Sequence, residues 1–248
     1  MVVRVRIHIA TPTRGQIRVQ YVYTLIPLVI SLATRKIQFV WVPEGTSPCW
    51  LARDACVRKF LGDHSATHLL FLDDDMQVDE DDLLKLLGSG HPCCAIAYRQ
   101  KPPDGIFVEY TLDVDNWQPV GLDGFVDVRH VGAGSLLVRR DVIEAMAARE
   151  PELAYETSKG RNLGLFRERV GPRFVGEDYA FCERVREAGH RIMVLVDAET
   201  DHVGEGHWSG NLRDYWPSIG KAMEEYPDAR NVEMLRRDLL QKQSKKNE

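Results

Sequence analysis

The apolar run THLLFL, residues 67–72, is followed at once by three aspartates, Asp73 to Asp75, and then by a helix-like segment. The run carries apolar residues on both faces of an extended chain, which predicts a strand inside a parallel sheet. Asp79 is expected to cap the following helix at residues 80–87. This unit restricts the chain to folds in which helices cover a buried sheet.

The segments around this unit repeat the same alternation. Strands are expected at residues 3–11, 37–45, 67–72, 93–100, 105–112, 124–131, 132–138 and 191–204. Helices are expected at residues 16–33, 51–61, 80–87, 139–150, 176–190 and 229–248, and a long loop at 151–174. This order predicts an α/β fold with helices on both faces of a sheet.

Composition argues against several classes of protein. The 248 residues carry a formal net charge of -5, without the clustered Lys and Arg typical of a nucleic-acid surface. The five cysteines form no CxxC pair, and the longest apolar stretch, residues 21–33, is shorter than the ~20 residues of a membrane span. Residues 1–15 lack a signal-peptide pattern, so we expect a soluble cytoplasmic protein without a membrane span.

Three consecutive carboxylates at a strand end need a partner for their charge. Ligands of open α/β sheets bind outside the carboxyl ends of strands, and Asp73 and Asp75 project to the same side of an extended chain. Two such carboxylates suit Mg²⁺ or Mn²⁺, which can bridge a nucleotide diphosphate. The alternative, one capping and two solvated aspartates, fits a single aspartate better than three.

Two later segments carry further candidates. Glu177 and Asp178 stand at the start of an expected helix, where a carboxylate can simply act as a cap. His202 lies at the end of the expected strand 191–204, where a lone histidine is more often structural than a ligand.

The order of all these segments resembles the GT-A glycosyltransferases. The turn TPTRG, the helix LARDA, FLDDD, AYRQK, the GAG strand, GEDYAFCERVREAG and HVG carry the resemblance over roughly residues 4–208. The likeness is to small bacterial and phage-type, family-2-like members. It implies a Rossmann-like mixed, mostly parallel sheet with helices on both faces, in a single domain with a C-terminal helical arm.

The resemblance also implies a division of the chain. A glycosyltransferase domain would cover residues 1–208, with a nucleotide-binding half at 1–100 and an acceptor-side half at 101–208. The helical arm would cover residues 209–248.

The implied activity is metal-dependent transfer of a sugar from a nucleotide-sugar donor, a UDP-sugar, to an acceptor hydroxyl. Asp73, Asp75 and His202 match the family's metal-binding residues, and an imidazole ligand favours Mn²⁺ over Mg²⁺. The acceptor stays open between a glycan, a small molecule and, less readily, a nucleic acid or protein. The sequence does not indicate an oligomeric state.

Other positions match donor-binding residues of the family. They lie in the first turn, near the base and ribose, in the LARDA helix that edges the donor site, and beside the diphosphate. These residues are Thr11, Pro12, Arg14, Arg53, Asp54, Asp73, Asp74 and Lys101. For Arg53 and Asp54, a surface ion pair is an equal alternative.

The Glu177-Asp178 pair matches the family's catalytic pair. In inverting members the aspartate takes the proton from the acceptor hydroxyl, so Asp178 is the candidate base and Glu177 its neighbour. Retaining members need no such base, and the preference for inversion is slight. Gly132 and Gly134 would let a sugar approach the backbone, or would only allow tight packing.

Aromatic residues in the C-terminal part have two interpretations. Trp208, Tyr215 and Trp216 could form a platform or lid over sugars, or could pack the C-terminal arm.

Three other functions remain open. A nucleotidyltransferase would use the same carboxylates but normally begins with a Gly-rich basic loop, which TPTRGQ matches poorly. A phosphotransferase with an aspartate nucleophile normally has small residues or Thr where DDDMQ has none. A non-catalytic sugar-binding protein would retain the carboxylates without turnover.

Overall fold

A seven-stranded sheet forms the centre of the protein. The structure is a computed structural model that describes residues 5–101, 110–204 and 206–225. The strands lie in the order β2-β1-β3-β9-β5-β12-β7. They are β1 (Arg6–Pro12), β2 (Gln38–Glu44), β3 (His68–Leu72), β5 (Cys93–Ile96), β7 (Phe125–Val128), β9 (Ser135–Arg139) and β12 (Ile192–Leu195).

The sheet is mixed and mostly parallel, which confirms the expected fold class. Strands β1, β2, β3, β5 and β12 share one direction. Strand β9 lies between β3 and β5 and runs antiparallel to both, and β7 at the edge runs antiparallel to β12.

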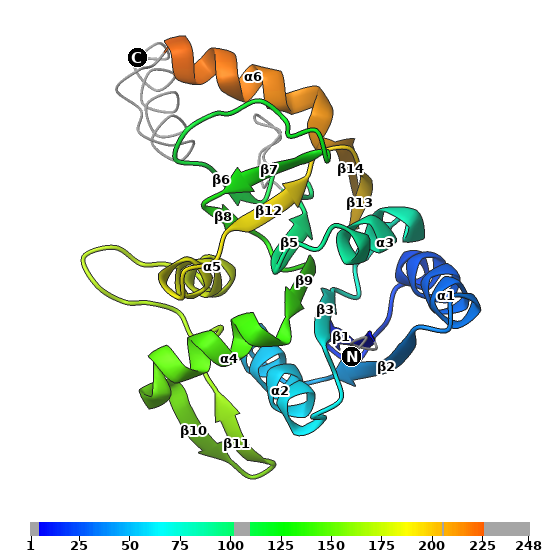
Figure 1. The fold of residues 1–248 in the computed structure, drawn as a ribbon, viewed down its shortest axis with the longest axis vertical. Helices are drawn as coiled ribbons and strands as arrows, with labels where there is room; N and C mark the ends of the chain where they lie inside the picture. The colour runs from blue at the N-terminus through cyan, green and yellow to red at the C-terminus, as the bar shows by residue number, and fades with distance from the viewer. Residues whose placement is uncertain (1–4, 102–109, 205, 226–248) are drawn as a thin grey trace.

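Helices cover both faces of the sheet (Figure 1). On one face, α1 (Val19–Thr34) and α3 (Glu80–Gly88) pack Leu28 and Leu83 into one core. On the other face lie α2 (Cys49–Gly62), α4 (Arg140–Arg149) and α5 (Glu177–Glu187), whereas α6 (Leu212–Glu225) lies at the end of the molecule and adds Leu212 and Trp216 to the same core (Figure 1). Two cores, one on each face, therefore hold the sheet.

A second, smaller sheet contains β4 (Met76–Val78), β13 (Glu199–Val203) and β14 (His207–Asn211), in the order β14-β13-β4. The single strand expected at 191–204 is therefore wrong. It divides at residues 196–198 into β12 of the central sheet and β13 of the small one. Strands β6 (Leu112–Asp113) and β8 (His130–Val131) form a separate short pair.

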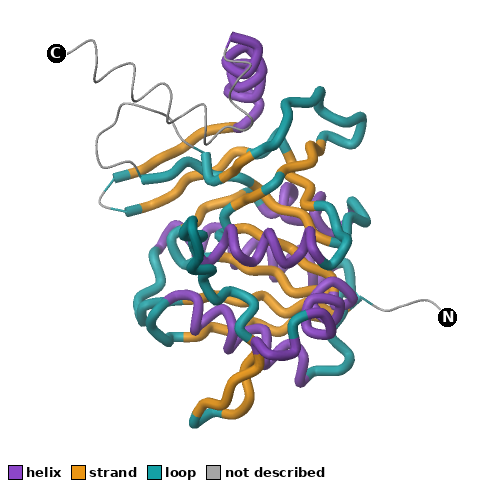
Figure 2. Tube along the Cα trace, turned by 90° about the vertical axis from the view of Figure 1, so that its left-hand side faces the viewer, coloured by secondary structure: helices purple, strands orange, loops and turns teal. Residues whose placement is uncertain are grey.

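The long loop expected at 151–174 is also wrong in its first half. A 3₁₀ turn (Pro151–Leu153) leads into a hairpin of β10 (Ala154–Thr157) and β11 (Gly160–Leu163), which projects from the body at the bottom of Figure 2. Gly160, at a φ of 113°, makes the turn that the sequence pattern did not suggest.

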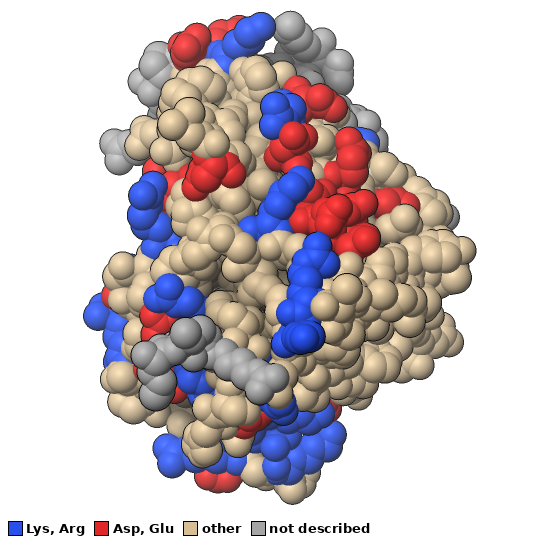
Figure 3. Space-filling model, turned by 45° about the vertical axis from the view of Figure 1, so that its right-hand side comes forward, with Lys and Arg blue, Asp and Glu red and all other residues tan. Residues whose placement is uncertain are grey.

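Within the expected C-terminal arm, residues 209–211 belong to β14, and the helix α6 follows at Leu212–Glu225. The helix expected at 229–248 and most of the strand expected at 105–112 lie outside the described residues. The predicted boundary at residue 208 falls within β14, and the division of the chain stays a prediction. None of the helices in the described ranges is long and apolar enough to cross a membrane. On the side of α1 the surface has a broad area without charged residues (Figure 3).

Candidate active site

A cleft of about 900 Å³ lies where the parallel strands end. It is lined mainly by residues 12–18 after β1, 45–49 after β2, 73–75 after β3, and by Lys101 after β5. Since these strands run in the same direction, their carboxyl ends meet at one edge of the sheet, where α/β proteins bind ligands. The three aspartates are therefore part of a concave site.

Asp75, Lys101 and His202 meet beside this cleft. The ammonium of Lys101 donates a hydrogen bond of 2.6 Å to Oδ2 of Asp75, and Nε2 of His202 lies 3.5 Å from the same oxygen. The pairing of β13 with β4 brings His202 to this site, because it places His202 opposite Met76, the residue after Asp75. Residues far apart in sequence are thus brought to one carboxylate.

The orientation of the His202 ring follows from its neighbours. Its Nδ1 donates to the carbonyl oxygen of Arg99 at 2.9 Å, so in the neutral ring Nε2 is an acceptor that faces a carboxylate. Burial raises the pKa of Asp75, but the neighbouring His202 and Lys101 outweigh it and bring the pKa to about 2. Two acceptors at this separation need a proton or a cation between them. Asp75 and His202 therefore fit a cation such as Mn²⁺, which accepts oxygen and nitrogen ligands.

Asp73 does not join this pair. Its two oxygens each accept a hydrogen bond of 2.9 Å from the guanidinium of Arg53. Within the described ranges, no three or more His, Cys, Asp or Glu side chains gather in a way that could hold a metal ion. Of the three predicted metal ligands, the structure brings together Asp75 and His202 alone.

Arg53 connects the aspartates to α5. Its side chain is buried, and its Nε lies 3.5 Å from both Oε1 of Glu177 and Oδ1 of Asp178. The guanidinium also lies over the rings of Phe71 and Phe166, each centroid 5.6 Å away. One buried cation thus faces three carboxylates, so it offsets charge that the apolar surroundings would not tolerate alone.

Asp178 has the features of a base. Its Oδ2 accepts a hydrogen bond of 3.1 Å from the backbone amide of Ala133, whereas Oδ1 accepts none from the part of the chain that the structure describes. Burial raises the pKa of Asp178 to about 6, although Arg53 opposes the rise. A carboxylate that is ionised at neutral pH and has an oxygen that accepts no hydrogen bond can accept the proton of a hydroxyl that reaches it.

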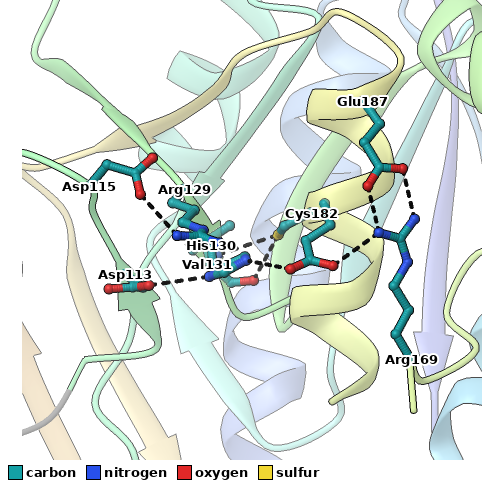
Figure 4. Close-up of polar contacts among 9 residues, drawn as sticks. Asp113, Asp115, Arg129, His130, Val131, Arg169, Cys182 and Glu187 are labelled. Atoms are coloured by element: carbon teal, nitrogen blue, oxygen red, sulfur yellow. Dashed lines mark hydrogen bonds and ion pairs between the residues drawn. The ribbon is translucent and has the colours of Figure 1, made fainter. Parts of the chain in front are cut away.

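A polar network between α5 and the β6–β8 pair holds this helix in place (Figure 4). The buried His130 stacks on Tyr179 with ring centroids 4.4 Å apart, and its Nδ1 lies 3.4 Å from Oδ2 of Asp113. Its Nε2 lies 3.8 Å from Glu183, which accepts a hydrogen bond of 3.0 Å from Arg169. The helix that carries Glu177 and Asp178 is therefore fixed by contacts along its length.

The predicted donor-binding residues divide into two groups. Pro12, Arg14 and Asp74 line the cleft, as Asp73 and Lys101 also do. Thr11 does not, because it is fully buried and its hydroxyl accepts a hydrogen bond of 3.0 Å from Trp41.

Asp54 lies away from the cleft, beneath the β10–β11 hairpin. It is fully buried and accepts hydrogen bonds from the hydroxyl of Tyr155 (2.9 Å) and the amide of Phe166 (3.1 Å). Burial raises the pKa of Asp54 to about 7. Since Arg53 is buried as well and pairs with Asp73, the surface ion pair considered for Arg53 and Asp54 is wrong.

Gly132 and Gly134 serve packing against Tyr98. A Cβ at Gly134 would lie 2.8 Å from the Tyr98 ring, and one at Gly132 would lie 2.6 Å from its hydroxyl. That hydroxyl accepts a hydrogen bond of 3.2 Å from the amide of Gly134. Similarly, Trp216 is buried and donates to the carbonyl of Gln118 at 2.9 Å, so it packs the arm against the body.

Two parts of the cleft were missed by sequence reasoning. Arg18 joins its walls, because its amide donates to the carbonyl of Asp74 and its guanidinium donates to the carbonyl of Gly204 at 3.1 Å. The segment 45–49 forms another wall. The turn sequence EGTSP after an expected strand was the available signal for this segment, whereas nothing local marked Arg18.

No family model matches the sequence, and no curated protein sequence matches it either. Solved structures do resemble the fold. The protein A197 of STIV is 17% identical with a TM-score of 0.49, and the match covers 84% of this chain and 91% of that one. Glycosyltransferases are also among the solved structures that the chain resembles.

Two of these glycosyltransferases show how similar the chain is to such structures. A mutant of Drosophila β-1,4-galactosyltransferase 7, in complex with manganese, UDP-Gal and xylobiose, is 14% identical with a TM-score of 0.43, covering 86% of this chain and 73% of that one. A glycosyltransferase involved in glycosylation of the major capsid of PBCV-1 is 14% identical with a TM-score of 0.33, covering 76% and 91%.

Proposed function

We propose that the protein is a metal-dependent glycosyltransferase that moves a sugar from a nucleotide-sugar donor, a UDP-sugar, to an acceptor hydroxyl. The observation that carries the proposal is the pair of Asp75 and His202 beside a cleft at the strand ends. An ionised carboxylate and an imidazole acceptor 3.5 Å apart suit a divalent cation, and the cleft has the volume for a nucleotide sugar.

Residues around the pair would hold the donor. Asp75 and His202 would bind the cation, Mn²⁺ in preference to Mg²⁺, which supplies positive charge for the departing diphosphate. The ammonium of Lys101 and the exposed guanidinium of Arg14 would add further positive charge in the same cleft. Asp73, held by Arg53, would keep a fixed position from which to contact the ribose.

Asp178 would act as the base. It would take the proton from the acceptor hydroxyl as that oxygen attacks the anomeric carbon, with inversion of configuration. Its Oδ1, which accepts no hydrogen bond within the described residues, and its raised pKa of about 6 support this role, with Glu177 as its neighbour. A retaining mechanism would leave Asp178 without this task.

The experiment is a product analysis over a panel of nucleotide sugars with Mn²⁺, with and without simple glycoside acceptors. We expect release of the nucleoside diphosphate, slow hydrolysis without acceptor, and loss of both with a chelator. The matched variants are Asp75→Asn in the cleft and Asp197→Asn on an exposed turn outside it. The first should remove activity, and the second should leave it unchanged.

Two results would contradict the proposal. Release of pyrophosphate from a nucleoside triphosphate and a sugar phosphate would identify a nucleotidyltransferase. Turnover of a nucleotide sugar that is equal in wild type and Asp75→Asn would remove the cation site from the mechanism.

A further inference from the structure

The outer face of α1 is apolar and exposed. The helix has no charged residue between Val19 and Thr34, and its inner face already packs on the sheet. Its outward side chains remain 39–63% exposed, and they are Val19, Val22, Tyr23, Ile26 and Ile30. Figure 1 shows α1 at one side of the molecule, and Figure 3, turned toward that side, shows the broad area without charged residues. Exposed apolar surface of this continuity marks an interaction site.

The exposed residues follow the spacing of a helix–helix seam. Val19, Tyr23, Ile26, Ile30 and Ala33 are separated by four, three, four and three residues, and all are exposed. This 3.5-residue period is the one by which two helices pack along each other with knobs in holes. A helix that only covers a sheet needs this pattern on its inner face, not on its outer one.

We propose that this surface, named here the α1 seam, is the interface of a homodimer in which α1 packs antiparallel to α1 of a second copy. A two-fold axis at Ile26 would bring that residue against its own copy. The same axis would place Tyr23 near the partner's Ile30 and Val19 near the partner's Ala33. Away from the axis, a larger side chain would thus meet a smaller one in each pair.

The area fits a second copy. Trp41 of β2, 40% exposed, lies beside α1, because its Nε1 donates to the hydroxyl of Tyr21, and it adds to the α1 residues that are 39–63% exposed. A standard interface buries about 800 Å² of each partner, so a second copy would cover the helix face and Trp41 together.

The charges around the seam are of both signs and lie outside it. Helix α3 packs beside α1 and presents the exposed side chains of Asp79, Asp81 and Lys85. Further exposed basic residues stand beyond the helix ends, Arg18 before α1 and Arg35 and Lys36 after it. Seam packing therefore buries no charge.

The test is the mass of the full-length protein in solution, measured by light scattering and by sedimentation over a range of micromolar concentrations. We expect twice the 28.3 kDa of one chain. Ile26→Glu should weaken the dimer at least roughly 100-fold, since two carboxylates would face each other in an apolar contact. Leu122→Glu, which replaces a fully exposed apolar residue elsewhere, should leave the dimer intact.

A crosslink gives a second readout that needs no destabilising charge. Ile26→Cys, at the proposed axis, should form a disulfide-linked dimer on mild oxidation, whereas Leu122→Cys should not; both are made with Cys49→Ser to remove the exposed native thiol. A monomer at all concentrations would overturn the proposal. So would a dimer that Ile26→Glu leaves intact, or a monomer that instead sediments with vesicles of phosphatidylcholine and phosphatidylserine.

Discussion

The carboxylate of Asp73 accepts two hydrogen bonds of 2.9 Å from the guanidinium of Arg53, which is buried beneath it. The carboxylate of Asp75, two residues further along the chain, contacts Lys101 and His202 instead. The acidic run at the end of β3 is therefore stabilised by two separate sets of partners. One set is permanent and structural, and the other lies at the cleft, where a cation can enter.

Removing the buried cation should destabilise the protein. In Arg53→Met, Asp73, Glu177 and Asp178 would lose their shared partner, and we expect the free energy of unfolding to fall by about 3–5 kcal/mol. Urea denaturation measures this change. Arg53→Lys, which keeps the charge but not the paired donors, should lose less. A loss under about 1 kcal/mol in Arg53→Met would mean that the three carboxylates do not depend on it.

Replacing the candidate base should separate binding from transfer. Asp178→Asn should bind UDP-sugar as wild type does and lower the transfer rate by about 10²–10⁴-fold, because no group then accepts the hydroxyl proton. Glu177→Gln should have a smaller effect. In wild type the rate should fall as the pH drops below about 6, where Asp178 becomes protonated. Equal rates in Asp178→Asn and wild type would remove this assignment.

Lys101 should compete with the cation for Asp75. Since its ammonium lies 2.6 Å from Oδ2, Lys101→Met should strengthen Mn²⁺ binding in the absence of nucleotide, and His202→Ala should weaken it. Calorimetric titration with Mn²⁺ checks both. His207→Ala, on the exposed strand β14, is the matched control and should change nothing. If His202→Ala behaves like this control, His202 has only a structural role.

Asp54 should make stability depend on pH. Because burial raises its pKa from 3.8 to about 7, the folded protein holds this proton more tightly than the unfolded chain does. Its contribution is fully present below pH ~4 and is lost as the pH rises toward 7, by roughly 4 kcal/mol in all. Asp54→Asn should remove this part of the slope in unfolding measured between these pH values. An unchanged slope would show that Asp54 titrates normally.

Gly134 should be needed for space. Gly134→Ala would place a Cβ 2.8 Å from the ring of Tyr98, and we expect a loss of about 1–3 kcal/mol in unfolding free energy. Gly88→Ala is the control, because a Cβ there meets nothing within 4 Å and alanine favours the helix. Thermal melting of both variants shows whether each substitution lowers or raises stability. If Gly134→Ala has no effect on stability, this glycine is not needed for packing against Tyr98 and would serve ligand binding instead.

The fold could be predicted where a segment's own pattern decides its structure. The apolar run before Asp73 forms the buried strand β3, and α1 forms despite Pro27. Strand β9 lies between β3 and β5 and runs antiparallel to both. This could not be predicted, because the apolar pattern of a strand does not determine which strands it pairs with or in which direction. The β10–β11 hairpin was missed because its polar residues lack strand alternation.

The site could be predicted only in part for a related reason. The aspartates were found because three carboxylates after a buried strand are unusual in any fold. Arg53 and Lys101 were expected at the donor site, but their ion pairs with Asp73 and Asp75 were not predicted, since both residues reach the aspartates through the packing of other elements. Asp54 was placed near the donor because it and Arg53 both match the helix that edges the donor site in the family. Consecutive helix residues point in different directions, however, and only Arg53 faces the carboxylate of Asp73, whereas Asp54 contacts Tyr155.

The most direct test of the account is a calorimetric titration of UDP into the protein with Mn²⁺ and then with a chelator. We predict binding that requires Mn²⁺ and that weakens at least roughly 100-fold in Asp75→Asn, but not in Asp197→Asn. Equal UDP affinity with and without Mn²⁺, or an unchanged affinity in Asp75→Asn, would contradict the claim that Asp75 holds the cation for a nucleotide-sugar donor.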